Sequence, residues 1–214
     1  MTAMSAIILC GGQSRRMGTD KAWLDFNGEP LLHRICRLTV PAVERLVVVA
    51  GQMQSLPDLP QHCDVVRDLY PNEGPLGGLL TGLHFLDEIH DAAPLVWLNS
   101  SDSPYVNAHA ISALGSLLQF DVQAQAVIPT SAGRQHPLNA VYRRSISAAV
   151  GECFATGQRS LKALIARLTV RLLDLDDSDF AAFDQDFTRN VNTPDDLQEA
   201  LRILKRSTHA SDAD

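Results

Sequence analysis

Short runs of apolar residues alternate with amphipathic stretches along most of the chain. The runs that predict buried strands are residues 6–9, 45–50, 63–66, 95–98, 125–129, 138–142 and 170–175. Helical spacing of apolar residues predicts helices from Pro30, from Leu79, and over 110–118, 147–154 and 161–168. Strands that alternate with helices are typical of a mostly parallel sheet with helices on both faces. The pattern therefore predicts a three-layer α/β/α, Rossmann-like fold.

Two details complete this pattern. Residues 23–26 alternate like a further short strand, and Asn27-Gly28 predicts a tight turn after them. We find neither an internal repeat nor an interdomain linker in the sequence. We therefore expect one domain over residues 1–206, followed by a polar, disordered tail at 207–214.

Composition limits the classes of function. Of 214 residues, 45% are hydrophobic and 20% are charged, as in ordinary globular domains. The net charge of −7 argues against a general nucleic-acid-binding surface. No apolar run reaches the roughly 18 residues of a membrane span, and the first strand starts too early to leave room for a signal peptide. The four cysteines are too widely spaced for a zinc motif, so we expect reduced thiols and a cytoplasmic location.

The candidate chemistry begins in residues 9–21, the loop that follows the first strand. Its three glycines allow the backbone to turn N–H groups toward an anion, and its cations are Arg15, Arg16 and Lys21. Backbone donors beside cations suit a triphosphate, whose charge must be neutralised and held in place. The loop is neither a Walker A loop nor a dinucleotide fingerprint. Within it, Cys10 is open to two interpretations, a reactive thiol or a small residue packed near backbone.

Three further segments each allow a structural and a functional interpretation. Residues 72–83 are rich in glycine and proline, which suits either close packing of a helix start or a flat base lying against backbone. Asp102 follows the strongest strand, where ligands bind in open α/β sheets and a carboxylate suits Mg²⁺. The same Asp-x-Pro sequence also forms turns without a ligand. In the loop 133–138, Arg134 and His136 are either surface groups or contacts to a phosphate.

Residues 190–197 contain the start of the last helix. Helix capping accounts for residues 193–196, which supply an N-cap threonine, a proline at the first helical position and two acids at the positive end of the dipole. It does not account for Asn190 and Asn192. These two amides are therefore candidates for a functional role.

The loop at residues 9–21 reads L-x-G-G-x-S-x-R-M-G-x-D-K, which resembles the signature of the molybdenum cofactor guanylyltransferases. The segments G-P-L-x-G at 74–78, Asp-x-Pro at 102–104, G-x-x-H-P-L at 133–138 and N-x-N-T-P-x-D-L at 190–197 are similar to further motifs of that family. The resemblance runs from Ile7 to about Leu201. It implies a fold of the nucleotide-diphospho-sugar transferase type and an enzyme that is a nucleotidyltransferase.

The reaction implied by this resemblance transfers GMP from GTP to molybdenum-molybdopterin and releases pyrophosphate, with Mg²⁺ as cofactor. Molybdoenzymes or their chaperones are the implied recipients of the product, and neither nucleic acid nor a membrane is an implied partner. The resemblance assigns catalysis to Lys21, Arg15 and Asp102, with Asp102 as the metal ligand. It assigns nucleotide binding to Leu9, Cys10, Gly11, Gly12, Lys21, Asp68, Pro75, Leu76, Gly77 and Asp102. It assigns acceptor binding to Arg16, Arg134, His136, Asn190 and Asn192.

Other functions stay open at this point. Within enzymes, the alternatives are cytidylyl transfer to the same cofactor and nucleotide transfer to a sugar phosphate. From another class, the chain could be a nucleotide-binding adaptor module without turnover. The glycine pair after the first strand and the segment 74–78 favour guanylyl transfer by resemblance. The presence of both Lys21 and Asp102 argues against a module that only binds.

Overall fold

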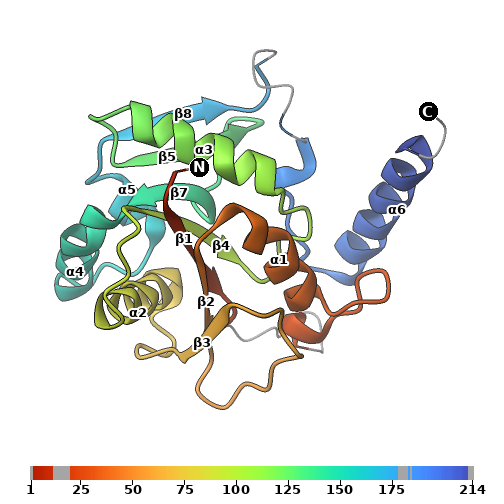
Figure 1. Ribbon diagram of the computed structural model, residues 1–214, viewed down its shortest axis with the longest axis horizontal. Coiled ribbons are helices and arrows are strands. Elements are labelled where there is room, and N and C mark those ends of the chain that lie inside the picture. The colour runs from red at the N-terminus through yellow and green to blue at the C-terminus, as the bar shows by residue number, and fades with distance from the viewer. Residues whose placement is uncertain (1, 12–19, 178–182, 184, 212–214) are drawn as a thin grey trace.

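The computed structural model of the chain describes residues 2–11, 20–177, 183 and 185–211. Its strands are β1 (Met4–Leu9), β2 (Arg45–Ala50), β3 (Cys63–Arg67), β4 (Leu95–Ser100), β5 (Ala126–Ser131), β6 (Arg134–Gln135), β7 (Asn139–Arg143) and β8 (Val170–Asp174). They form one sheet in the order β3-β2-β1-β4-β7-β5-β6, and β8 pairs with β5 (Figure 1). The first four strands in this order are parallel, whereas β7 runs antiparallel to both β4 and β5. The predicted mostly parallel sheet is confirmed.

Helices cover both faces of this sheet. They are α1 (Leu31–Thr39), α2 (Gly74–Glu88), α3 (Ala108–Phe120), α4 (Ser147–Ala155), α5 (Leu161–Ile165) and α6 (Pro194–Ser211). Short 3-10 helices are η1 (Lys21–Trp23), η2 (Val40–Ala42), η3 (Arg144–Ile146) and η5 (Gln185–Thr188). Buried residues of α1, α3 and α6 share one hydrophobic cluster, and those of α2, α4 and α5 share the other. The three-layer α/β/α architecture is confirmed.

The central strands contribute side chains to both clusters in alternation. In β1, Ala6 and Ile8 pack with α1 and α3, while Ile7 packs with α2. In β4, Trp97 faces the first cluster and Leu98 the second. A strand that is buried on both faces favours apolar side chains at successive positions. This explains why these strands appear in the sequence as continuous apolar runs.

The prediction of a strand over residues 23–26 is wrong. The 3-10 helix η1 ends at Trp23, and Asp25 makes only an isolated antiparallel bridge to Pro30. The predicted turn is present, since Asn27 and Gly28 both have positive φ, 59° and 87°. The alternation of residues 23–26 arises because Leu24 and Phe26 are buried while Trp23 and Asp25 are exposed.

Helix α2 begins at Gly74, earlier than the predicted start at Leu79. Pro75 lies in its first turn, where a missing N–H costs no helical hydrogen bond. Two of the glycines inside the helix, Gly78 and Gly82, lie against β1. A Cβ atom at Gly82 would come within 2.7 Å of Ile7, and one at Gly78 within 2.9 Å of Leu9. The packing interpretation of these two glycines is therefore the one that the structure supports.

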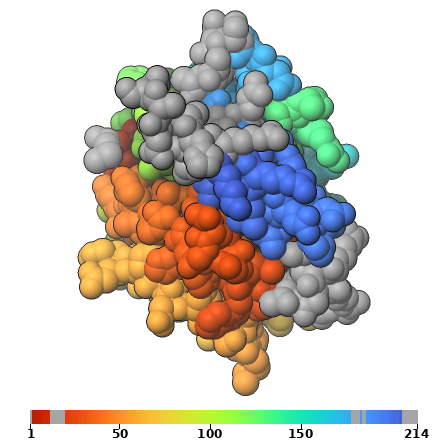
Figure 2. All heavy atoms as spheres, turned by 90° about the vertical axis from the view of Figure 1, so that its right-hand side faces the viewer, coloured from red at the N-terminus to blue at the C-terminus, as the bar shows by residue number. Residues whose placement is uncertain are grey.

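The C-terminal helix packs beside the N-terminal part of the chain. The hydroxyl of Tyr105 donates to the backbone oxygen of Ala200 at 2.6 Å, and Leu197 and Leu201 pack against the first cluster. In Figure 2 the blue surface of this region adjoins the orange-red surface of the segment around η1 and α1. Helix α6 continues to Ser211, past the boundary at 206 where the sequence predicted the domain to end. In the part of the chain that the structure describes, no helix is both long and apolar enough to cross a membrane.

Candidate active site

A cavity of about 990 Å³ lies at the edge of the sheet where β1, β2 and β4 end. Carboxyl ends of parallel strands meet at one edge, and ligands of open α/β sheets bind there. The residues lining the cavity include Leu9, Cys10, Gly11, Lys21, Asp68, Pro75 and Asp102. All seven were predicted from the sequence as nucleotide-binding residues. The structure thus brings most of that predicted set to one cavity.

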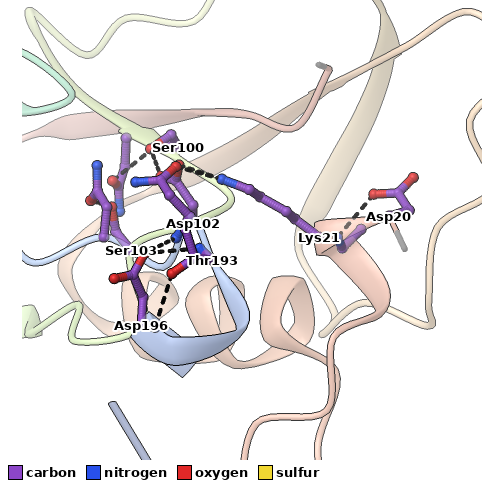
Figure 3. A network of polar contacts seen from close by, with 11 residues as sticks. Asp20, Lys21, Ser100, Asp102, Ser103, Thr193 and Asp196 are labelled. Carbon is purple, nitrogen blue, oxygen red and sulfur yellow. Dashed lines mark hydrogen bonds and ion pairs between the residues drawn. The ribbon is translucent and has the colours of Figure 1, made fainter. Parts of the chain in front are cut away.

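Lys21 connects three segments that are far apart in the sequence. Its ammonium nitrogen Nζ lies 3.1 Å from Oδ2 of Asp102 and 2.8 Å from Oδ1 of Asn192. Figure 3 shows the Lys21 side chain extending from η1 toward Asp102. The side chains of Lys21 and Asp102 are 17% and 18% exposed, so both can reach a ligand in the cavity. A predicted catalytic pair and a predicted acceptor-binding amide therefore lie in direct contact.

The carboxylate of Asp102 is oriented by its neighbours. The hydroxyl of Ser100, at the end of β4, donates to Oδ1 of Asp102 at 2.5 Å. The backbone N–H of Val191 donates to the backbone oxygen of Asp102 at 2.8 Å. Among the hydrogen bonds between described residues, none brings a backbone N–H to this carboxylate, as a turn-forming aspartate would. The geometry favours the interpretation of Asp102 as a ligand-binding group.

A capping box holds Asn192 next to Lys21. The hydroxyl of Thr193 accepts the N–H of Asp196 at 3.2 Å, and Oδ2 of Asp196 accepts the N–H groups of Thr193 and Asn192 at 2.8 and 2.9 Å. The hydrogen bond from the backbone of Asn192 is the main reason why the pKa of Asp196 lies below its usual value, and burial opposes this shift. The predicted helix cap is confirmed. It also positions the neighbouring amide in the site.

Cys10 lines the cavity but is not activated. Burial raises the pKa of its thiol to about 12, with Asp20 adding to the rise and hydrogen bonds from Ser101 and Gln54 opposing it. A thiol with such a pKa is almost entirely protonated at neutral pH, and the nucleophile in cysteine chemistry is the thiolate. Of the two interpretations of Cys10, the packed small residue is the one that fits.

The opposite wall of the cavity is built around the start of α2. Pro75 and Gly78 line it, as does Asp68, whose Oδ1 accepts the backbone N–H of Tyr70 and the hydroxyl of Thr81. Two residues predicted to bind the nucleotide lie elsewhere. They are Leu76, whose side chain is fully buried in the second cluster, and Gly77, which packs against Tyr70 and Glu73. Neither is among the residues that line the cavity.

Three further predicted acceptor residues that the structure describes, Asn190, His136 and Arg134, lie at the same edge of the sheet, outside the cavity lining. Asn190 accepts a hydrogen bond from the hydroxyl of Ser103 at 2.9 Å. His136 is half-buried, and its Nε2 lies 2.8 Å from the hydroxyl of Ser131. Burial, assisted by the charge of Arg134, lowers the pKa of His136 below its usual value. Arg134 is exposed on β6.

Some predicted residues lie outside the described part of the chain, and some described residues were not predicted. Gly12, Arg15 and Arg16 belong to the first group, so their assigned roles stay predictions. In the second group are cavity residues such as Ser100 and Gln54. No local sequence signal identifies these two, because their contacts depend on how separate loops meet.

The charges of the cavity indicate what a ligand must bring. Its described lining carries the carboxylates of Asp20, Asp68 and Asp102 against the single ammonium of Lys21. A nucleotide triphosphate bound against this wall needs positive charge in addition to that of Lys21. In the described part of the chain, no group of three or more metal-binding side chains is present. One carboxylate, that of Asp102, is suited to a hard cation whose other ligands are phosphate oxygens and water.

A mostly parallel sheet, with a glycine-bearing loop and a lysine–aspartate pair at its carboxyl edge, is typical of α/β proteins that bind nucleotides. A sequence model of the MobA-like NTP transferase domain matches residues 6–172. The chain belongs to this family, which confirms the resemblance found in its motifs. A relative from Chloroflexus aggregans, named "Probable molybdenum cofactor guanylyltransferase", is 34% identical over 91% of this chain and 92% of its own length. The molybdenum cofactor guanylyltransferase of Rhizobium rhizogenes is 30% identical over 92% of this chain and 90% of its own.

Solved structures share the fold at lower sequence identity. Molybdopterin-guanine dinucleotide biosynthesis protein A from Archaeoglobus fulgidus superposes with a TM-score of 0.76 at 21% identity, covering 95% of this chain and all of that one. The 2-C-methyl-D-erythritol 4-phosphate cytidylyltransferase of Thermus thermophilus superposes with a TM-score of 0.67 at 14% identity, covering 96% of this chain and 100% of that one. These neighbours confirm the nucleotide-diphospho-sugar transferase type of fold.

Proposed function

We propose that this protein transfers GMP from GTP to molybdenum-molybdopterin, forming the guanine dinucleotide form of the cofactor and pyrophosphate. The observation that carries the proposal is the contact of Lys21 with Asp102 and Asn192 at the wall of a cavity large enough for a nucleotide. Family membership and the names of the relatives agree with it.

In the proposed step, an oxygen of the terminal phosphate of molybdopterin attacks the α-phosphorus of GTP. A new P–O bond forms there, the bond from the α-phosphorus to the bridging α–β oxygen breaks, and pyrophosphate leaves with that electron pair. The attacking phosphate is already ionised, so no protein nucleophile or general base is required. The protein then contributes alignment of the reactants and stabilisation of the charge that develops.

The residues of the site divide this work. The ammonium of Lys21 neutralises charge on the α-phosphate and on the leaving pyrophosphate, together with Arg15. Backbone N–H groups of the loop that begins at Gly11 and Gly12 hold the phosphates. The wall formed by Asp68 and Pro75 receives the guanine. The N–H groups of guanine can donate hydrogen bonds to the carboxylate of Asp68. These are the assignments made from the sequence, and the cavity lining supports those of Lys21, Gly11, Asp68 and Pro75.

Asp102 is the proposed ligand of a divalent cation, for which we propose Mg²⁺. When bound, Mg²⁺ supplies Lewis-acid neutralisation of phosphate oxygens. The excess of carboxylates on the described cavity wall supports a requirement for such a cation. Ser100 donates a hydrogen bond that orients the Asp102 carboxylate, and Lys21 donates to the other oxygen of the same carboxylate.

On the acceptor side, Asn192 lies beside Lys21, and we propose that it contacts the phosphate of molybdopterin. Asn190, Arg134, His136 and Arg16 are the further proposed contacts of the acceptor. We also propose that the reaction takes place in the cytoplasm and that a molybdoenzyme or its chaperone receives the product.

A panel of nucleotides tests the proposal. Purified protein is incubated with molybdenum-molybdopterin, Mg²⁺ and one of GTP, CTP, ATP or UTP, and pyrophosphate is measured. Release with GTP alone, together with the guanine dinucleotide product identified by mass spectrometry, is the expected result. Release with CTP instead would make the protein a cytidylyltransferase. Nucleotide binding without pyrophosphate from any of the four would indicate an adaptor module.

A further inference from the structure

Gln54 lies in the loop after β2, and no motif of the sequence assigns it a role. Its side-chain nitrogen Nε2 lies 2.8 Å from Oδ2 and 3.1 Å from Oδ1 of Asp20. The same nitrogen lies 3.2 Å from the backbone oxygen of Cys10. One amide thus contacts both the residue that follows β1 and the residue that precedes Lys21.

The amide of Gln54 has no hydrogen-bonding group left for a strong contact with a ligand. Its two N–H groups are directed to Asp20 and Cys10, and its oxygen Oε1 accepts the backbone N–H of Gly51 at 2.9 Å. Although Gln54 lines the cavity, its polar atoms therefore bond to other residues of the protein and not to a ligand.

The loop that carries Gln54 is itself held in place. Nη1 of Arg67, at the end of β3, donates to the backbone oxygens of Gln54 and Gly51 at 2.8 and 2.9 Å. The backbone N–H of Gln54 donates to the backbone oxygen of Gly51 at 3.2 Å. The amide is thereby presented from a fixed position at the ends of β2 and β3.

Asp20 connects this amide to Lys21. Its Oδ1 accepts the N–H of Ala22 at 3.0 Å, which makes Asp20 the N-cap of η1, and Lys21 is the first residue of η1. Figure 3 shows Asp20 at the opposite end of Lys21 from the Asp102 carboxylate. Since η1 has only three residues, its orientation depends strongly on its cap and on the contact of Trp23 Nε1 with the backbone oxygen of Ser55 at 3.1 Å.

We propose that Gln54 is a positioning residue for Lys21, acting through Asp20. The inference rests on the proposed function, in which Lys21 acts on the transferred phosphate. Removing the amide takes away the side-chain donor that the described residues supply to the Asp20 carboxylate, and it lets η1 shift. A displacement of about 1 Å at a reacting group can cost on the order of a hundredfold in rate.

A double-mutant cycle tests the coupling. Turnover with Mg²⁺-GTP and molybdenum-molybdopterin is measured for wild type, Gln54→Ala, Lys21→Ala and the double variant. Gln54→Ala is expected to lower kcat by about tenfold or more in the wild-type background and by less than about threefold when Lys21 is absent, because the effect passes through Lys21. An equal loss in both backgrounds, or an unchanged kcat in Gln54→Ala, overturns the proposal.

A second variant separates the hydrogen bonds from packing. Gln54→Glu keeps the shape of the side chain but replaces its two N–H donors with a second carboxyl group that faces Asp20, where two negative charges repel each other, so kcat is expected to fall. The control is Gln61→Glu, which adds the same charge at an exposed position and is expected to leave turnover unchanged. Wild-type turnover in Gln54→Glu contradicts the proposal.

Amide hydrogen exchange provides a readout that does not depend on turnover. The N–H groups of Ala22 and Trp23 bond to Asp20, and their exchange is expected to accelerate in Gln54→Ala but not in Gln61→Glu. If wild-type protein releases no pyrophosphate, the proposed function fails, and this exchange experiment still decides whether Gln54 holds η1. Unchanged exchange overturns the inference whether or not the enzyme turns over.

Discussion

The two walls of the cavity are held together in different ways. The charged wall consists of Asp20, Lys21 and Asp102. In it, the side chain of Lys21 bonds to Asp102 and to Asn192 across sequence separations of 81 and 171 residues. The helix wall consists of Gly74, Pro75 and Gly78 at the start of α2. It is shaped by the close approach of the α2 backbone to β1.

The charged wall therefore serves the reaction through its side chains, whereas the helix wall depends on close packing. On the charged wall, the functional groups are side chains whose exchange alters charge at the reacting phosphates. On the helix wall, the decisive property is the absence of side chains, which lets α2 lie close to β1. We therefore expect substitutions on the charged wall to change turnover with little effect on folding, and substitutions in the glycines of α2 to change stability.

Asp102→Asn gives the largest expected effect. The amide keeps the size of the side chain but lacks the negative charge that a hard cation requires. We expect pyrophosphate release to fall on the order of a thousandfold and its dependence on Mg²⁺ to disappear, while the melting temperature without metal stays near that of wild type. A variant that keeps the wild-type Mg²⁺ dependence would show that the metal is bound by another residue.

Lys21→Ala is expected to lower kcat on the order of a hundredfold and to weaken GTP binding much less. The ammonium meets charge that grows in the transition state, and such an interaction acts mainly on kcat. Steady-state kinetics together with calorimetric GTP titration would separate the two effects. Equal kcat values at saturating GTP would make Lys21 a cation of the cavity wall without a role in the reaction.

The variant Gly82→Ala tests the packing that shapes the helix wall. Gly82 lies in α2, one turn beyond the cavity residue Gly78. The added methyl group would meet the fully buried Ile7 at 2.7 Å, and overpacking of this kind costs about 1–3 kcal/mol, against a gain of up to about 1 kcal/mol in helix propensity. We expect a net loss of stability in thermal or urea unfolding, with GTP affinity of the folded protein retained.

Gly151→Ala is the matched control for that variant. Gly151 also lies inside a helix, α4, and a Cβ atom there has no neighbour within 4 Å. We expect it to stabilise the protein by about 0.4–1 kcal/mol. Equal changes in the two variants would mean that contact with β1 does not determine the glycine at position 82.

The smallest expected effect concerns the capping box that supports the charged wall. The pKa of Asp196 is lower in the folded protein than its usual value of 3.8. Its contribution to stability is therefore present above that value and is lost as the pH falls through the folded pKa. Asp196→Asn should lower the melting temperature at pH 7 by about 1–3 °C, and the difference from wild type should shrink below about pH 4.

Asp195→Asn serves as the control for the capping box. Asp195 lies in the same first turn but is exposed. It supplies only the favourable interaction of a negative charge with the helix dipole. If both variants change the melting temperature equally at every pH, the hydrogen bonds of Asp196 to Thr193 and Asn192 contribute nothing measurable.

Much of the site could be predicted because its residues stand at the ends of recognisable elements. Lys21 ends a long loop motif, Asp102 follows a strongly apolar strand, and Asn192 precedes a helix cap with its own local signal. Leu76 was predicted to bind the nucleotide, yet its side chain is buried, because a motif match does not say which way a helical side chain points. In α2 that direction is set by the packing of the helix on β1, which buries Leu76 in the second cluster.

By itself, the sequence determined the fold class, the strands of the sheet other than the two-residue β6, and the cap of the last helix, because apolar periodicity and capping are local properties of the chain. Only the tertiary structure decided that Gln54 contacts both Cys10 and Asp20, that Gly82 lies against Ile7, and that Cys10 is buried and protonated. These features depend on how loops and helices from distant parts of the chain approach one another. That approach is set by the packing of two hydrophobic clusters on a shared sheet, for which no local pattern in the sequence is sufficient.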